Sequence, residues 1–226
     1  MERYELKKFI TYEQYLILRT RVKALMRVDP YSMPSGDYVV SNIYFDDIYN
    51  SAYNEKLDGV KKRDKYRIRS YNGDDSYIVL ECKAKQGDRI YKRQERIAAE
   101  TLNRLYEGDI TCFDEYDNEL CREVSVKMRS CGLTPKVSVI YRREAYIYPI
   151  CETRVTFDMD LHASNDLRMF GGVAGVPVFS QQRGIMEIKY NDFIPKHIVS
   201  AITSSAPRMA LSKYCLCRER LHGRIE

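Results

Sequence analysis

The feature of the sequence that most restricts its fold is a pair of strand-like segments whose charged residues share one face. Residues 65–71 are basic at positions 65, 67 and 69, and residues 76–85 are charged at positions 81, 83 and 85. Side chains two positions apart in a strand point the same way, so each segment has a charged face. The turn signal Asn72-Gly73-Asp74 predicts that the two segments form a β-hairpin. This hairpin would line a cleft or channel for a polyanion.

The same alternation of charged positions recurs along the chain. It is found at Arg3/Glu5/Lys7, Lys65/Arg67/Arg69, Glu81/Lys83/Lys85, Lys92/Gln94/Arg96, Arg154/Asp158 and Glu187/Lys189. The opposite faces carry Tyr, Ile, Val and Leu and are expected to pack on helices. A closed antiparallel β-barrel of about eight strands, with helices packed outside, would bury the apolar faces and leave no free strand edge. We therefore predict an α+β fold with a polar tunnel.

The charges themselves indicate what such a tunnel would hold. Cations gathered in a lumen repel one another unless an anion lies among them. The carboxylates of Glu5, Glu81, Asp158 and Glu187 suggest that a divalent metal ion accompanies this anion, as in phosphoryl-transfer sites. The three histidines of the chain are expected to be surface or packing residues.

Composition and length limit the alternatives. The 226 residues contain no linker-like boundary and predict one domain, 1–226, and the net charge of +5 does not require a nucleic-acid partner. No apolar run approaches the roughly 20 residues of a membrane-spanning helix, and the first residues do not resemble a signal peptide. The seven cysteines match no zinc pattern, which favours reduced thiols in a cytoplasmic protein.

Helices are predicted between and after the strands. Thr11 and Gln14 form a capping-box pattern that begins the first helix, which ends before Pro30. A longer helix is expected at about 112–130, and another in the C-terminal segment 207–221. Residues 162–176 are expected to form a glycine-rich loop.

Short motifs distributed over nearly the whole chain carry a family resemblance. They are RYELKKF near the start, NIYFDD at 42–47, G-x-x-x-R-x-K-x-R-I-R-x-Y at 59–71, LECK at 80–83, IYRREAY at 140–146, RVTFD at 154–158, MEIKY at 186–190 and LSKY at 211–214. In this order, they resemble the VTC domain of polyphosphate polymerases, within the triphosphate tunnel metalloenzyme superfamily. The resemblance implies a tunnel barrel that binds ATP with Mn²⁺ or Mg²⁺. It also implies transfer of the γ-phosphate onto a growing inorganic polyphosphate chain.

The resemblance assigns roles position by position. The residues that match the phosphate-binding, catalytic basic residues of the family are Lys7, Arg67, Arg69, Lys83, Lys92, Arg143 and Arg154. Tyr141, Ser212 and Lys213 match further substrate contacts, and Lys189 is expected to join them because it shares the charged face of Glu187. Glu187 matches the metal-binding glutamate.

Two departures from the family pattern are informative. The fungal members have a lysine three residues before the final one, where this chain has Ala210; Arg208 is the candidate substitute. Those members also carry an SPX domain and a membrane anchor, which this sequence lacks. We therefore expect a stand-alone catalytic module, with a possible membrane partner protein.

Two other functional classes stay open. Tunnel-fold hydrolases, such as tripolyphosphatases, usually have E-x-E-x-K on the first strand, whereas this chain has Arg3-x-Glu5-x-Lys7, which favours the polymerase. The other class is a non-catalytic module that binds polyphosphate or inositol phosphates. Nucleic acid is disfavoured because the cations would face inward and no base-stacking motif is present.

Overall fold

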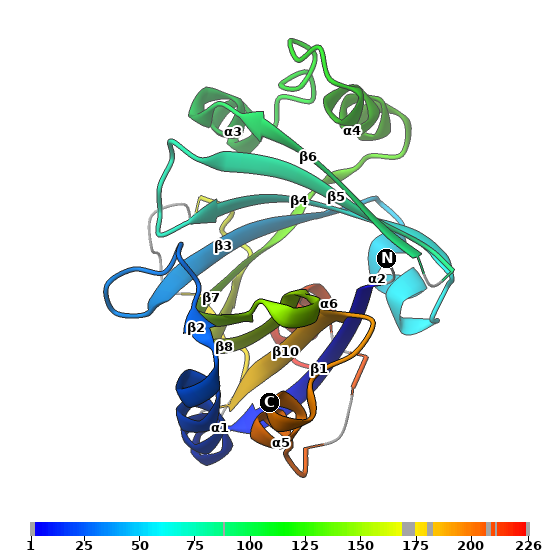
Figure 1. Ribbon diagram of the computed structural model, residues 1–226. Helices are drawn as coiled ribbons and strands as arrows, with labels where there is room; N and C mark the ends of the chain where they lie inside the picture. The colour runs from blue at the N-terminus through cyan, green and yellow to red at the C-terminus, as the bar shows by residue number, and fades with distance from the viewer. Residues whose placement is uncertain are drawn as a thin grey trace.

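Antiparallel strands form the framework of the molecule (Figure 1). The computed structural model describes residues 3–87, 89–168, 175–179, 183–206, 209–210 and 212–224. Its main sheet follows the order β1 (Arg3–Thr11), β10 (Arg183–Asn191), β8 (Thr153–Ser164), β7 (Thr134–Tyr148), β3 (Asp37–Asp46), β4 (Lys62–Tyr71), β5 (Ile78–Gln86) and β6 (Arg89–Ile97). Two short strands complete it: β2 (Arg27–Val28) pairs with β7, and β9 (Val176–Pro177) pairs with β8.

The expected closure of the sheet into a barrel is not found. Within the described part of the chain, β1 pairs only with β10 and β6 only with β5, so the eight-strand path is open between β1 and β6. The other edge of β1 is used elsewhere, since the Met209 N–H donates to the Lys7 carbonyl at 3.0 Å. Side-chain alternation determines which face of a strand is buried but does not determine whether the first and last strands meet.

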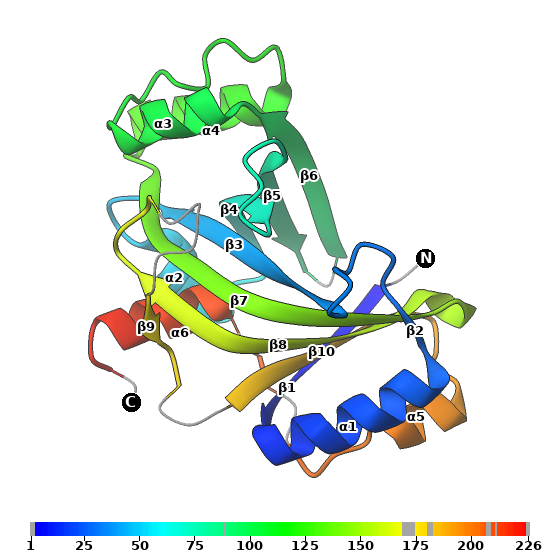
Figure 2. The same cartoon turned by 90° about the vertical axis from the view of Figure 1, so that its left-hand side faces the viewer.

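Helices cover the two outer faces of this curved sheet (Figures 1 and 2). α3 (Ala99–Tyr106) and α4 (Glu119–Ser130) pack over β4 and β5, where Ile68 and Leu80 are fully buried. α1 (Tyr12–Leu25) and α5 (Lys196–Ile202) cover β8 and β10, burying Val155 and Ile188. The prediction that the apolar strand faces pack on helices is therefore confirmed.

The remaining helices lie near the inward faces of the strands. α6 (Lys213–Leu221) packs Tyr214 and Cys217 in one cluster with residues of β7 and β8, and α2 (Ser51–Leu57) lies beside it. The buried carboxylate of Asp46 joins these elements: it accepts from the backbone N–H groups of Ala52 and Tyr53 and from the Tyr214 hydroxyl. A short 3₁₀ turn, Ile150–Glu152, connects β7 to β8.

The predicted capping box is found in the structure, whereas the predicted boundaries of several other elements are displaced. The Thr11–Gln14 capping box begins α1 as predicted. The helix predicted from residue 112 begins only at Glu119, where Asn118 caps it, and the C-terminal helix begins at Lys213, where Ser212 caps it. The expected loop at 162–176 is wrong at its ends, which belong to β8 and β9, while residues 169–174 lie outside the described part.

Candidate functional site

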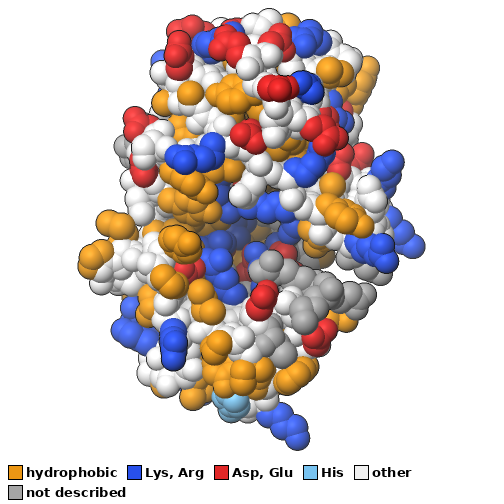
Figure 3. Space-filling view, turned by 45° about the horizontal axis from the view of Figure 1, so that its top comes forward, with side chains coloured by type: hydrophobic (Ala, Val, Ile, Leu, Met, Phe, Trp, Pro, Cys, Tyr) orange, Lys and Arg blue, Asp and Glu red, His pale blue; other side chains and the backbone are white. Residues whose placement is uncertain are grey.

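Between the two halves of the sheet lies a cavity of about 350 Å³ whose lining is strongly basic. Its walls contain eleven basic side chains and two acidic ones. The space-filling view shows a hollow in this face of the molecule with Lys and Arg side chains inside it (Figure 3). A buried surface with so large an excess of one charge is expected only where a ligand of opposite charge binds.

One wall of the cavity is formed by β1 and β10, where lysines and glutamates alternate across the strands. Lys7 is paired with Glu187 in the register, and its ammonium lies 2.6 Å from Glu5 and 3.7 Å from Glu187. Lys189 contacts the other oxygen of Glu187 at 2.5 Å. Each cation of this wall therefore has a carboxylate within reach.

The ion pairing continues on β7, β8 and the start of α6. Arg143 donates two hydrogen bonds to the Asp158 carboxylate, at 2.5 and 2.7 Å, and Lys213 reaches the same group at 2.6 Å. The Asp158 side chain has no solvent exposure. Arg143 and Lys213 also lie over the Tyr141 ring, 5.2 and 4.9 Å from its centroid. We call the following set the ion-paired wall: Glu5, Lys7, Arg143, Asp158, Glu187, Lys189 and Lys213.

Charges in the ion-paired wall keep its carboxylates ionised despite their burial. Burial and Glu187 disfavour the charged form of Glu5, but Lys7, Lys83 and Lys189 outweigh them and lower the pKa of Glu5 to about 2. Burial likewise opposes ionisation of Glu187, and Lys7 and Lys189 hold its pKa well below its usual range. Both groups are therefore anionic at neutral pH.

Residues of β4, β5 and β6 form a second ion-paired group around one buried glutamate. Arg67 donates to Glu81 through Nε at 2.6 Å and to the Tyr44 hydroxyl at 3.2 Å, while Lys92 reaches Glu81 at 2.6 Å. Burial disfavours ionisation of Glu81, but Arg67, Arg69 and Lys92 lower its pKa to about 2. Lys83 of β5 contacts Glu5 of β1 at 3.0 Å, although no strand pairing joins these two strands.

Arg69 is held by neutral groups. Its Nε donates to the amide oxygen of Asn42 at 2.8 Å, and its Nη2 donates to the Tyr141 hydroxyl at 3.5 Å. Arg69 is buried, and no described carboxylate lies within 4 Å of it. The guanidinium is thus fixed in position and retains its full charge for a ligand.

Four further cations gather where α2 and the adjoining ends of β4 and β5 meet, and we call them the basic end of the cavity: Lys56, Arg63, Lys65 and Lys85. Within the described ranges, none of them has a carboxylate within 4 Å. Lys65 donates to the Ser212 hydroxyl at 3.0 Å, and burial lowers its pKa to about 8. The basic end therefore carries charge that the protein leaves uncompensated.

Ten of the residues selected from the sequence line this one cavity. They are Lys7, Arg67, Arg69, Lys83, Tyr141, Arg143, Glu187, Lys189, Ser212 and Lys213. Lys92 and Arg154 are not among the lining residues. Lys92 contacts Glu81 at 2.6 Å, and Arg154 donates to Asp29 at 2.5 Å and to the Tyr38 hydroxyl at 3.0 Å. Ala210 lines the cavity, and its candidate substitute Arg208 lies outside the described residues.

Tyr44 and Lys56 were missed by sequence reasoning although both line the cavity. Tyr44 lies within the NIYFDD motif, and its position on the inward face of β3 could have been found from the strand period. Lys56 lies on α2, and hydrogen bonds to Asp46 position this helix beside the cavity. No local sequence pattern predicts that position.

A divalent cation fits this donor set only if a ligand brings part of its coordination shell. No group of three or more His, Cys, Asp and Glu side chains suited to a metal is present among the described residues. Glu5 and Glu187, however, both reach the Lys7 ammonium, so two carboxylates flank one point of the wall. Mg²⁺ is commonly held by one or two carboxylates together with phosphate oxygens. Glu187, with Glu5 beside it, fits that kind of site.

The fold and the site define a class of protein in which an antiparallel sheet curves around a basic cavity and helices cover its outer faces. The chain belongs to the VTC domain family, whose model matches residues 2–222. No curated protein matches the chain by sequence.

One solved structure shares its fold. A putative adenylyl cyclase from Hippeastrum, described as having a dominant triphosphatase activity, is 12% identical with a TM-score of 0.58, covering 97% of this chain and 96% of its own. A putative adenylate cyclase from Bacillus halodurans is also 12% identical, with coverage of 89% and 87% and a TM-score of 0.49.

Among the described residues, no helix is both long and apolar enough to cross a bilayer.

Proposed function

We propose that this chain is a metal-dependent polyphosphate polymerase that transfers the γ-phosphate of ATP onto a growing inorganic polyphosphate chain. The observation that carries the proposal is the convergence of eleven basic and only two acidic side chains on one cavity. Membership of the VTC domain family supports it. ATP and polyphosphate both present closely spaced phosphoryl oxygens, which such a lining binds well.

Arginines of β4 and β7 would fix the phosphates. The guanidinium of Arg69 is held by Asn42 and Tyr141 and can direct its remaining N–H groups at a phosphate in a fork geometry. Arg67 and Arg143 are held instead by ion pairs, with Glu81 and Asp158 respectively. These partners prevent the arginines from reorienting when the cavity holds no anion.

Lysines would stay in contact with the negative charge of the phosphoryl group as it is transferred from donor to acceptor. Lys7, Lys189 and Lys213 are flexible point charges on the ion-paired wall, and Lys83 reaches that wall through its contact with Glu5. Ser212 supplies a hydroxyl next to Lys65. Lys92 would act through Glu81, and Arg154, adjacent to Lys189 in the register, is proposed to contact phosphate after exchanging Asp29 for it.

Phosphoryl transfer of this kind asks little covalent chemistry of the protein. The terminal phosphate of the acceptor chain is already ionised, so no general base is needed, and the residues must hold donor and acceptor in line. Mn²⁺ or Mg²⁺ held by Glu187 would neutralise charge on the phosphate oxygens. The basic lining stabilises the charge that is spread over the transferred group.

Triphosphate hydrolysis is the second candidate, and the triphosphatase activity described for the Hippeastrum protein favours it. We expect no nucleic-acid partner, because the cations that line the cavity face inward. The cysteines whose side chains the structure describes are free thiols. We expect a cytoplasmic location on that ground, where a membrane partner protein could receive the product.

Incubation with ATP and Mn²⁺, followed by gel electrophoresis for polymer and an assay for released phosphate, tests the proposal. Polyphosphate on the gel supports the polymerase, and phosphate release without polymer overturns it in favour of the hydrolase. Polyphosphate binding without either product would leave a binding module. A variant with the exposed Arg21→Gln change, remote from the cavity on α1, serves as a matched control.

A further inference from the structure

We propose that the nucleoside of the triphosphate donor binds against an apolar rim of the cavity, formed by Ile90, Met209 and Ala210. The inference rests on the proposed function, because it places the part of ATP that carries no phosphate. It adds a statement about the donor that the basic lining does not make. Apolar contact, and not a base-specific hydrogen bond, would hold the nucleoside, so ATP and GTP should bind alike.

The rim differs from the rest of the lining in its chemistry. Among the described residues that line the cavity, only Ile90, Met209 and Ala210 have apolar side chains without an aromatic ring. Ile90 is 45% exposed and Met209 43%, so these side chains lie at the mouth of the cavity. Inorganic polyphosphate has no apolar part to place against them. A nucleoside does, because the faces of its base and the carbon atoms of its ribose gain from leaving water.

The size of the cavity favours the same placement. Its volume of about 350 Å³ is near the lower limit for small-molecule sites. The triphosphate carries the negative charge and fits the basic interior. The nucleoside would therefore extend to the mouth, where the apolar rim lies.

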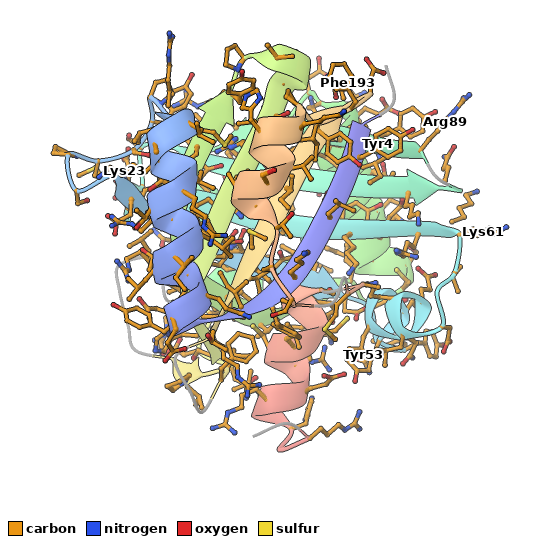
Figure 4. All side chains as sticks on the ribbon, turned by 60° about the horizontal axis from the view of Figure 1, so that its bottom comes forward. Tyr4, Lys23, Tyr53, Lys61, Arg89 and Phe193 are labelled. Atoms are coloured by element: carbon orange, nitrogen blue, oxygen red, sulfur yellow. The ribbon has the colours of Figure 1, made fainter. Side chains whose placement is uncertain are left out.

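Ile90 reaches the mouth from β6, close to the start of β1. It lies on the same face of the sheet as Lys83, one row further along, and Lys83 contacts Glu5 at 3.0 Å. Figure 4 labels Arg89 and Tyr4, which precede Ile90 and Glu5 in the chain, and shows both on the same side of the molecule. The strand that carries Ile90 therefore ends near the strand to which Met209 is bound.

Met209 is held beside β1 by a backbone hydrogen bond. Its N–H donates to the Lys7 carbonyl at 3.0 Å. The ammonium of Lys7 lies 2.6 Å from Glu5 and 3.7 Å from Glu187, the two carboxylates that fit a metal ion bound with phosphate oxygens. A nucleoside at the rim thus lies next to the residues proposed to act on its phosphates.

The two tyrosines of the lining offer no competing surface for a base. Tyr141 is 2% exposed, and Arg143 and Lys213 lie over its ring. Tyr44 is 8% exposed, and its ring packs against that of Tyr214 at a centroid distance of 5.5 Å. Base stacking needs an accessible aromatic face. Because protein groups cover both rings, the rim is the apolar surface that remains.

The same lining has little with which to distinguish one base from another. Its described residues include no Asn, Gln or Thr side chain, and the Ser212 hydroxyl already accepts from Lys65. A site discriminates strongly between related ligands when it hydrogen-bonds a group that only one of them has, whereas apolar contact discriminates weakly. We therefore expect the affinities for ATP and GTP to agree within about threefold.

The experiment compares the natural chain with a rim variant, Ile90→Ser with Met209→Ser, and a control variant, Leu16→Ser with Ile17→Ser. The control removes apolar side chains of similar exposure, 44% and 53%, from α1 on the outer face. Calorimetry measures the affinities for ATP, GTP and tripolyphosphate in EDTA, so that none of them is turned over. ATP turnover is then measured with Mn²⁺.

We expect the rim variant to bind ATP and GTP about tenfold more weakly, because their nucleosides lose apolar contact. Its affinity for tripolyphosphate should change by less than about twofold, and the control variant should match the natural chain. With Mn²⁺, the KM for ATP should rise while kcat stays within about twofold, as expected for a contact made equally in the ground state and the transition state.

Equal losses for all three ligands, or no loss for ATP, overturn the rim. So does a preference of the natural chain between ATP and GTP of more than about tenfold. If the natural chain binds ATP but forms no polymer, the proposed polymerase fails, while the three affinities still decide on the rim.

Discussion

The ion-paired wall and the basic end line the same cavity but treat buried charge differently. In the wall, Asp158 is shared by Arg143 and Lys213, so each charge has a partner that offsets its desolvation. At the basic end, Lys65 contacts the Ser212 hydroxyl and the Tyr214 ring but no described carboxylate within 4 Å, and burial lowers its pKa to about 8. The wall is therefore stable without a ligand, whereas the basic end becomes stable when an anion arrives. This difference suggests that the wall positions reacting groups and the basic end supplies affinity.

Among the substitutions that test this difference between the wall and the basic end, we expect Glu187→Gln to have the largest effect. Glu187→Gln keeps the shape of the side chain but removes a carboxylate that is proposed to hold the metal ion. We expect Mn²⁺-dependent ATP turnover to fall at least about 100-fold, while tripolyphosphate still binds because the basic end is intact. Turnover and tripolyphosphate affinity are measured on the same protein.

Glu107→Gln, on the exposed end of α3, is the matched control for Glu187→Gln. If Glu187→Gln keeps its turnover with an unchanged metal requirement, Glu187 serves only as a partner of Lys7 and Lys189. The ion-paired wall would then have a structural role alone.

The second prediction tests whether pairing stabilises the wall. Arg143→Met removes two hydrogen bonds from a fully buried carboxylate and leaves Asp158 with Lys213 alone. The free energy of unfolding should fall by about 3 kcal/mol, since an incompletely compensated buried charge remains. Urea denaturation followed by circular dichroism measures the change. An Arg143→Met protein as stable as the natural chain would contradict the account of the wall.

The third prediction concerns the basic end and has the opposite sign. At pH 7, Lys65→Met removes a charge whose burial is uncompensated, so the free energy of unfolding should rise by up to about 2 kcal/mol. Its affinity for tripolyphosphate should fall about tenfold, because a charge-assisted contact is lost. Denaturation and calorimetry on one preparation measure both, with the exposed Lys23→Met as control.

The pH dependence of Lys65 gives this prediction a second readout. Its pKa in the folded chain is about 8, below the ordinary value of 10.5, so the folded state binds fewer protons between these values. Stability contributed by this group therefore rises with pH from about 8 to about 10.5, and its cost is fully present below pH 8. A bound anion favours the charged lysine, so tripolyphosphate binding near pH 8 should take up protons. Absence of this uptake, or its persistence in Lys65→Met, would remove Lys65 from the anion site.

The sequence predicts the inward-facing charges because strand alternation is a local property. Arg67 and Glu81 lie opposite each other in the hairpin closed by Asn72-Gly73, so the hairpin alone brings them together. The contact between Lys83 and Glu5 joins residues far apart in the chain and depends on the curvature of the sheet. Alternation contains no information on that curvature, which is why closure of the barrel was wrongly expected.

Helix-borne residues show a second limit. Ser212 and Lys213 were identified only through the family resemblance, since nothing in the local pattern places the start of α6 at the cavity. Lys56 was missed for the same reason. In both cases the helix is held by tertiary hydrogen bonds to Asp46, through Tyr214 in α6 and through backbone N–H groups in α2. Residues on strands are therefore predictable here, and residues on docked helices are not.

We expect the smallest effect from breaking an ion pair outside the cavity. This substitution tests whether ion pairing stabilises the protein when the paired charges are not buried. Arg129 contacts Asp114 at 3.0 Å on the surface of α4, where both side chains are more than two-fifths exposed. Arg129→Gln should change the free energy of unfolding by less than about 1 kcal/mol, because water solvates the freed carboxylate. Turnover should be unchanged. If this variant loses as much stability as Arg143→Met, then pairing as such stabilises the protein, and burial does not explain the difference between the wall and the basic end.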